Sequence, residues 1–190
     1  MPGVNVAVIV GSNRRDSINR KLARALVRLA DGKLAASFVR IDDLPMYNQD
    51  LESPLPESVA LQGCDRGSYS SADRDTPAQP LDSGCSQERH RLGTRPYGCN
   101  SWVGKVVAII GTSPGVMGTA IAQQHLRQVL GDLRALVMGG EAYVMFKPDL
   151  IDETGTVADT GTLRLLQSFI DQFAGLAAKL TTPKTYTVAA

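Results

Sequence analysis

Residues 4–19 read VNVAVIVGSNRRDSIN, an apolar run that ends in a short polar loop. The near-continuous valine and isoleucine over residues 4–10 is typical of a buried parallel strand. Apolar residues then recur at helical spacing, which predicts a helix over residues 18–30. A strand, a tight polar loop and a helix can hold a phosphate, because backbone N–H groups at the helix N-terminus point at the anion.

The loop also carries side chains that can donate to a phosphate. Ser12, Ser17 and Asn19 are neutral donors, and Arg14 or Arg15 would add charge-assisted hydrogen bonds. The loop matches neither the P-loop nor the GxGxxG dinucleotide fingerprint. An ordinary strand–helix turn with Ser17 as N-cap fits the same spacing. The residues alone therefore leave both interpretations open.

The rest of the chain alternates between strands and helices. Strands are expected over residues 36–41 and 106–110 and, with an interruption, over 136–138 and 142–145; helices are expected over 119–130 and 162–180. In the helix over 119–130, one face carries Ile121, Ala122, His125, Leu126 and Val129. This alternation predicts a single domain over residues 1–190, a three-layer α/β/α fold with a flavodoxin-like doubly wound parallel sheet. Ligands of such sheets bind beyond the carboxyl ends of the strands, where Gly11–Ser17 and Thr112–Gly118 lie.

Composition excludes several classes of protein. The 20 Lys and Arg balance 19 Asp and Glu, which leaves no electrostatic footprint for nucleic acid or an anionic membrane. No apolar run approaches the roughly 18 residues of a spanning helix, and the N-terminus lacks a signal-peptide pattern. Three cysteines, Cys64, Cys85 and Cys99, lack metal-ligand spacing, and an odd number argues against a disulfide framework. We expect a cytoplasmic protein without a metal site, and a frayed tail over residues 181–190.

Several blocks of the sequence match one family. Gly-Ser-x-Arg-x-x-Ser-x-Asn at residues 11–19 is joined by DLPMYNQD at 43–50, RPYG at 95–98, TSPGVMG at 112–118 and HLRQ at 125–128. Together they resemble the NADPH-dependent FMN reductase family, in particular its chromate and quinone reductase branch. The resemblance implies FMN as cofactor and NADPH or NADH as co-substrate. It also implies a ping-pong cycle in which a quinone, chromate or a similar acceptor takes the electrons.

The resemblance also assigns site residues. The FMN phosphate would be held by Ser12, Arg14, Ser17 and Asn19. The isoalloxazine ring would lie beside Ser113, Pro114, Gly115 and Gly118. No side chain is assigned as catalytic, since the flavin itself carries the redox reaction. Related proteins form dimers and tetramers, so we expect a homodimer or homotetramer; Arg127 and Glu141 are candidate subunit contacts, or a pair on one subunit's surface.

Residues 63–101 break the pattern. They contain no Val, Ile, Phe or Met, although the fold needs a strand and a helix here, and the family's Pro-Glu-Tyr-Asn loop, which packs against the flavin ring, is absent. A shifted reading frame joins the last two bases of each codon to the first base of the next codon. In this frame the codons of residues 71–77 permit Val-Leu-Ile-Val-Thr-Pro, which would be a buried strand. Residues 79–94 permit Asn-Arg-Ser-Ile-Pro-Gly-Val-Leu-Lys-Asn-Ala-Ile-Asp-Trp-Ala, which resembles the family's next segment. Pro77, Ala78 and Gln79 do not encode Glu and Tyr in that frame.

We therefore hypothesise that residues 63–94 are frameshifted, with a divergent insertion as the alternative. The loss of the Pro-Glu-Tyr-Asn loop bears on ring binding more than on phosphate binding. An alternative function follows: a flavodoxin-like protein that is a non-catalytic or damaged FMN or nucleotide binder.

Overall fold

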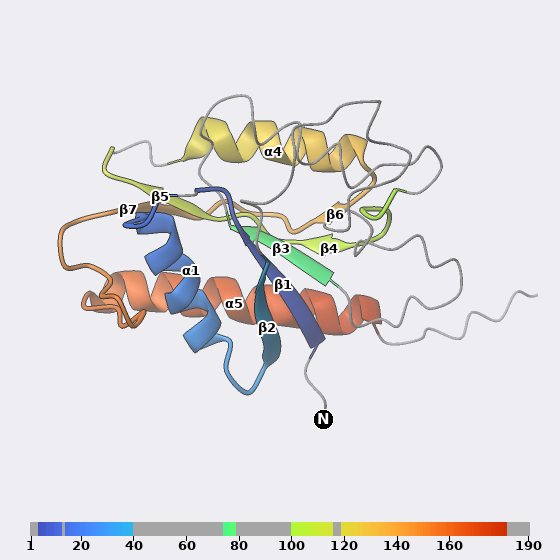
Figure 1. The fold of residues 1–190 in the computed structure, drawn as a ribbon. Coiled ribbons are helices and arrows are strands. Elements are labelled where there is room, and N and C mark those ends of the chain that lie inside the picture. The colour runs from blue at the N-terminus through green and yellow to red at the C-terminus, as the bar shows by residue number, and fades with distance from the viewer. Residues whose placement is uncertain (1–3, 13, 40–73, 79–99, 116–118, 182–190) are drawn as a thin grey trace, which may run out of the picture.

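A central parallel sheet is built around the first strand. The computed structural model describes residues 4–12, 14–39, 74–78, 100–115 and 119–181, and for 74–78 it describes the backbone alone. Strand β1 (Val4–Val10) lies between β2 (Leu34–Val39) and β3 (Arg74–Ala78), and both pairings are parallel (Figure 1). In this register Val6 of β1 stands opposite Ala36 on one side and Arg74 on the other.

Two further segments continue the sheet, each as two short strands. In one, β4 (Val106–Val107) and β5 (Gly111–Ser113) follow each other; in the other, β6 (Leu136–Val137) and β7 (Tyr143–Met145) do so. The pairs β4–β6 and β5–β7 are parallel, and β3 lies beside β4. Across the sheet the order is therefore β2, β1, β3, the segment with β4 and β5, and the segment with β6 and β7. Numbered as five strands along the chain, this is the order 2-1-3-4-5, which is the flavodoxin-like arrangement. The predicted fold class is confirmed, as is the interruption between β6 and β7.

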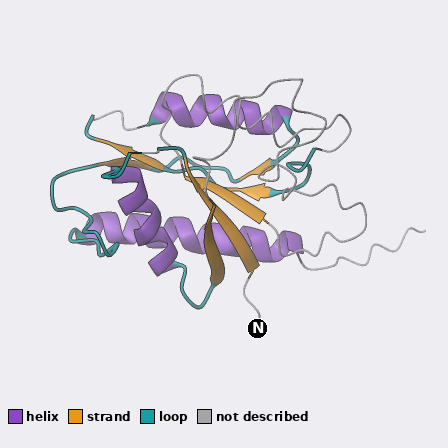
Figure 2. Ribbon diagram, in the orientation of Figure 1, coloured by secondary structure: helices purple, strands orange, loops and turns teal. Residues whose placement is uncertain are grey.

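Helices cover both faces of the sheet (Figure 2). On one face lie α1 (Ile18–Leu29) and α5 (Thr160–Thr181), and on the other lies α4 (Ala120–Asp132). The strand residues divide between the two faces by alternation. Val106, Ala108 and Ile110 pack in the core formed with α1 and α5, whereas Val107 and Ile109 pack with α4. This gives the three layers expected from the sequence.

The buried residues of α4 do not coincide with the face that carries Ile121 and His125. Ile121 is 70% exposed and His125 is exposed, whereas the buried residues are Gln123, Leu126 and Leu130. The spacing of Gln123, Leu126 and Leu130 gives a helical stripe as good as the apolar one, and hydrogen bonds satisfy the Gln123 amide nitrogen. The face that carries Ile121 and His125 is therefore not the one that packs on the sheet.

Some expectations fall outside the described residues. These are the positions of Gly118, of the three cysteines, of residues 43–50 and 79–94, and of the tail after residue 181. Within the described ranges, no helix is long and apolar enough to cross a membrane, and no cluster of His, Cys, Asp or Glu is suited to a metal ion.

Candidate cofactor site

The loop between β1 and α1, Gly11–Ser17, forms the first half of the candidate site, and we call it the phosphate loop. Ser12 lies two residues after the end of β1 and is half-buried. Ser17 is buried and is the N-cap of α1, where its Oγ accepts a hydrogen bond from the Arg20 backbone N–H at 3.3 Å. The N-cap interpretation of Ser17 is thus confirmed. The same hydroxyl retains its proton as a donor, so capping and anion binding are compatible.

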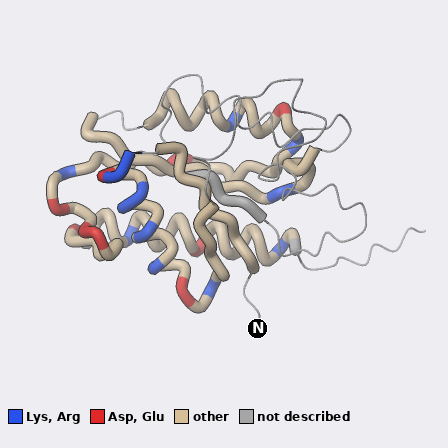
Figure 3. The backbone as a smooth tube through the Cα atoms, viewed as in Figure 1, with Lys and Arg blue, Asp and Glu red and all other residues tan. Residues whose placement is uncertain are grey.

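Positive charge is concentrated at the start of α1. Arg14 and Arg15 are exposed, and within the described part of the chain neither has a hydrogen-bond or ion-pair partner. The first turn of the helix has no acidic residue, and the loop's Asp16 is exposed to solvent. Basic residues continue along α1, beside acidic residues of the loop that precedes α5 (Figure 3).

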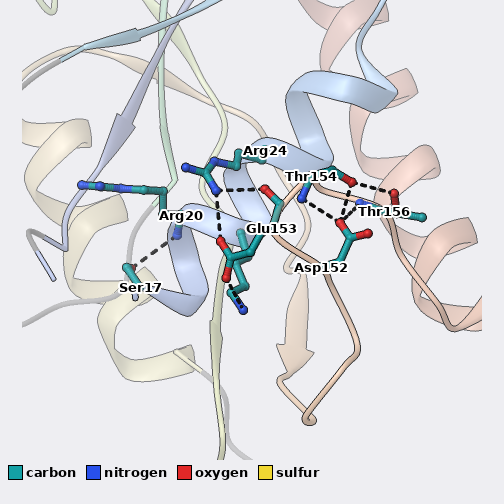
Figure 4. A network of polar contacts seen from close by, with 8 residues as sticks. Ser17, Arg20, Arg24, Asp152, Glu153, Thr154 and Thr156 are labelled. Atoms are coloured by element: carbon teal, nitrogen blue, oxygen red, sulfur yellow. Dashed lines mark hydrogen bonds and ion pairs between the residues drawn. The ribbon is translucent and has the colours of Figure 1, made fainter. Parts of the chain in front are cut away.

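That acidic loop neutralises the cations farther along the helix. Glu153 pairs with Lys21 at 2.8 Å and with Arg24 at 3.2 Å, while Arg20 points away from it (Figure 4). The Lys21 hydrogen bond lowers the pKa of Glu153. The cations left for an anion therefore lie at the N-terminal end, next to the phosphate loop.

The loop over residues 152–156 is itself tightly folded. The Asp152 carboxylate accepts hydrogen bonds from the Thr154 hydroxyl at 2.7 Å and from the Thr154 and Thr156 N–H groups at 2.8 Å each (Figure 4). These bonds, the Thr154 hydroxyl first, lower the pKa of Asp152 to about 2. Gly155 has a φ of +83°, and its backbone approaches that of α1 so closely that a Cβ there would lie 2.8 Å from the Ala25 nitrogen. The loop is thereby held against the middle of α1.

The second half of the site starts at the end of β5, with Ser113, Pro114 and Gly115, which we call the ring loop. Ser113 is half-buried, and its Oγ accepts a hydrogen bond from the Gly115 N–H at 3.3 Å. Pro114 and Gly115 are exposed, and Gly118 lies outside the described residues. The β5 strand that leads into this loop lies against α1, so the two loops share one edge of the sheet.

Asn19 joins the two halves. Its side chain is buried, donates from Nδ2 to the Thr112 carbonyl at 3.0 Å, and accepts at Oδ1 from the Thr112 N–H at 2.9 Å. The Thr112 hydroxyl in turn donates to the Val144 carbonyl of β7 at 2.8 Å. Sequence reasoning placed Asn19 among the phosphate donors and missed Thr112 as its partner.

A second buried amide stabilises the start of α4. Gln123 donates from Nε2 to the Thr119 hydroxyl at 2.9 Å and to the Ala142 carbonyl at 3.0 Å. Thr119 therefore holds Gln123 rather than capping α4 with its side chain. No sequence motif pointed to Gln123, since a glutamine on a helix is most often solvated.

The described residues fit the phosphate end of a flavin mononucleotide. The anion would meet a helix N-terminus, the neutral donors Ser12 and Ser17 and a free Arg14, with no carboxylate in the first turn of α1. The glycine and proline of the ring loop expose backbone where a flat ring could approach it.

Comparison with known proteins decides the family. The model of the NADPH-dependent FMN reductases matches residues 4–66 and 89–148. The chain belongs to this family. The resemblance inferred from the motifs is confirmed, and with it an NAD(P)H-dependent oxidoreductase that uses FMN.

Relatives match over nearly the whole chain. A 2-hydroxy-1,4-benzoquinone reductase of Burkholderia is 39% identical over 178 residues, which cover 90% of this chain and 94% of the relative. A quinone reductase of Pseudomonas putida is 38% identical over 180 residues, covering 90% and 92%. Among solved structures, the flavoenzyme NAD(P)H:(acceptor) oxidoreductase FerB of Paracoccus denitrificans has a TM-score of 0.84 at 40% identity, covering 93% of this chain and 98% of its own.

Proposed function

We propose that this chain is an FMN-dependent NAD(P)H:quinone oxidoreductase, and that chromate or a similar oxidant can replace the quinone. One observation carries the proposal. Two cofactor loops, joined by Asn19 and Thr112 at the carboxyl edge of the sheet, occur in a chain 39% identical to a benzoquinone reductase over 94% of that relative. The matched relatives take quinones by name, which makes a quinone the first acceptor to test.

The side chains have binding and orienting roles in this proposal. Ser12, Arg14, Ser17 and the N-terminus of α1 hold the phosphate. Bound FMN supplies the redox chemistry, namely hydride acceptance from NAD(P)H and electron delivery to an acceptor. The ring loop and Gly118 offer backbone groups to the isoalloxazine ring and orient it. No side chain is required to act as a general acid or base.

The sequence of strand β3 supports the alternative function, a damaged or non-catalytic protein that binds FMN or a nucleotide. Strand β3 occupies the centre of the sheet, between β1 and β4, yet its sequence is Arg-Asp-Thr-Pro-Ala. Central parallel strands are normally apolar, and Pro77, opposite Ile9, has no N–H to donate to a ladder. In this alternative the chain keeps its phosphate loop but binds the flavin ring poorly or turns over no acceptor.

The same strand supports our proposal that residues 63–94 are frameshifted. Strand β3 overlaps the stretch for which the shifted frame gives Val-Leu-Ile-Val-Thr-Pro. The family model leaves residues 67–88 unmatched. The alignments with relatives at 38–39% identity span more than nine-tenths of each relative's length. We therefore infer that the segment replaces family sequence rather than adding to it. Sequencing of the coding DNA tests this: a compensating insertion and deletion around the segment supports the frameshift, and their absence refutes it.

We further propose a homodimer or homotetramer that works in the cytoplasm, where NAD(P)H is supplied. Ile121 of α4 is 70% exposed, and Tyr143 and Met145 of β7 are exposed apolar residues. Glu141 accepts hydrogen bonds from Gln124 and from Tyr143 in the same region. Arg127 donates to the Met138 and Gly140 carbonyls, so both candidate contact residues also have partners within the chain. Light scattering of wild type and Ile121→Glu tests the assembly: a fall in mass supports a subunit contact there, and a wild-type monomer refutes it.

Steady-state kinetics test the activity. With NADPH and 1,4-benzoquinone varied together in the presence of FMN, we expect parallel double-reciprocal lines, the pattern of a ping-pong reaction. A protein that binds FMN but oxidises no NADPH or NADH with any quinone supports the non-catalytic alternative instead.

A further inference from the structure

We infer that Asn19 is a positioning residue for the flavin, acting through Thr112 to set the ring loop against the phosphate loop. This inference rests on the proposed FMN site. It differs from the role implied by the family resemblance, in which the Asn19 side chain binds the phosphate.

The geometry of the Asn19–Thr112 pair carries the inference. A single side chain satisfies both the N–H and the carbonyl of Thr112, at 2.9 and 3.0 Å, and both residues are buried. This pairing imitates the exchange of hydrogen bonds between neighbouring strands. It requires a donor and an acceptor on one planar group, which Asn has and Asp lacks when ionised. Buried away from water, the two bonds have no solvent to replace them.

The pair stands between the two loops. Asn19 lies two residues after the N-cap Ser17, and Thr112 directly precedes Ser113. The Thr112 hydroxyl adds a third bond, to Val144 of β7. The end of β5 is thus held from α1 on one side and from β7 on the other. Any movement of Thr112 would carry Ser113 with it.

A ligand with two ends is sensitive to this spacing. FMN must meet the phosphate loop and the ring loop at once, and the second contact gains from the first only when both are correctly placed. Without the Asn19–Thr112 hydrogen bonds both loops are still present, but their positions relative to each other are no longer fixed. The ring loop itself is affected, so a flavin without a phosphate loses affinity as well.

Riboflavin, which lacks the phosphate, separates positioning from phosphate binding. For Asn19→Ala and Asn19→Asp we expect the affinities for FMN and for riboflavin each to fall about tenfold. The visible circular dichroism of the bound flavin should also change at saturation, because the ring surroundings change. Arg14→Ala is the matched control: it should weaken FMN but leave riboflavin affinity and the ring spectrum unaltered.

A second variant guards against misfolding of the first. Thr112→Val keeps the backbone bonds to Asn19 and removes only the hydroxyl bond to Val144, so it should weaken both flavins in the same direction by a smaller factor. Thr112→Ser keeps the hydroxyl, so it should bind both flavins more tightly than Thr112→Val does.

Each outcome decides the inference. Parallel loss of FMN and riboflavin affinity with a changed ring spectrum supports it. If the Asn19 variants lose FMN affinity alone, Asn19 binds the phosphate and the inference is wrong. If they melt at lower temperature but bind both flavins normally, the pair serves the fold only. A wild-type chain that binds neither flavin contradicts the proposed function, and this role of Asn19 with it.

Discussion

Gly155 offers the sharpest test of how the loop that precedes α5 packs against α1. A Cβ at this position would lie 2.8 Å from the Ala25 nitrogen, 2.8 Å from the Arg24 carbonyl carbon and 3.0 Å from the Arg24 carbonyl oxygen. All three atoms belong to the backbone of α1 and cannot rotate away. Gly155→Ala must therefore push the loop over residues 152–156 off the helix or bend the helix itself.

The cost has two parts. A non-glycine residue at the Gly155 φ of +83° costs about 1–2 kcal/mol, because its Cβ crowds the carbonyl. Overpacking against fixed atoms costs about 1–3 kcal/mol more. The sum, about 2–5 kcal/mol, should lower the melting temperature by about 5–15 °C in a domain of this size.

Gly32→Ala is the matched control. Gly32 has a φ of +73°, and a Cβ added there would have nothing within 4 Å, so this variant carries the backbone cost alone. Thermal unfolding of the flavin-free protein, followed by circular dichroism, measures both variants. If Gly155→Ala melts no lower than Gly32→Ala, the close contact between the loop and α1 does not exist and the reasoning fails.

Three further predictions concern the site and its surroundings. Arg14→Ala should lower FMN affinity at least about tenfold, since a charge-assisted hydrogen bond is worth roughly 1.5–3 kcal/mol; unchanged affinity in a fluorescence titration would remove Arg14 from the site. Gly115→Val should weaken FMN binding while leaving the flavin-free melting temperature nearly unchanged, because only the Ser113 Oγ, at 3.7 Å, is near a Cβ there; equal losses would assign the glycine to the fold. The Asp152 pKa lies at about 2 against a usual 3.8, so its contribution to stability is complete above about pH 4 and is lost as the pH falls through 2. The melting temperatures of wild type and Asp152→Asn should thus converge between pH 4 and 2, and a constant difference would contradict the assignment.

The sequence predicts those parts of the fold that depend on local pattern. The apolar run of β1, the N-cap at Ser17 and the amphipathic α5 are visible within short windows, and the structure confirms each. Hydrophobicity alone does not identify the buried residues of α4, because tertiary hydrogen bonds bury Gln123 while Ile121 is exposed. Such bonds involve partners that no local window contains.

The candidate site shows the same division. Ser12, Arg14 and Ser17 follow from the motif around the first helix. The partner of Asn19 does not, since Thr112 lies 93 residues farther along the chain. Strand β3 is the reverse case: its sequence argues against a strand, and its place is set by the neighbouring β1 and β4.

The flavin content of the purified chain tests the central claim most directly. We expect a yellow protein that releases FMN on denaturation and, after removal of the flavin, takes up one FMN per chain in a fluorescence titration. A colourless chain that remains flavin-free when FMN is added in large excess would contradict the claim that these two loops form an FMN site.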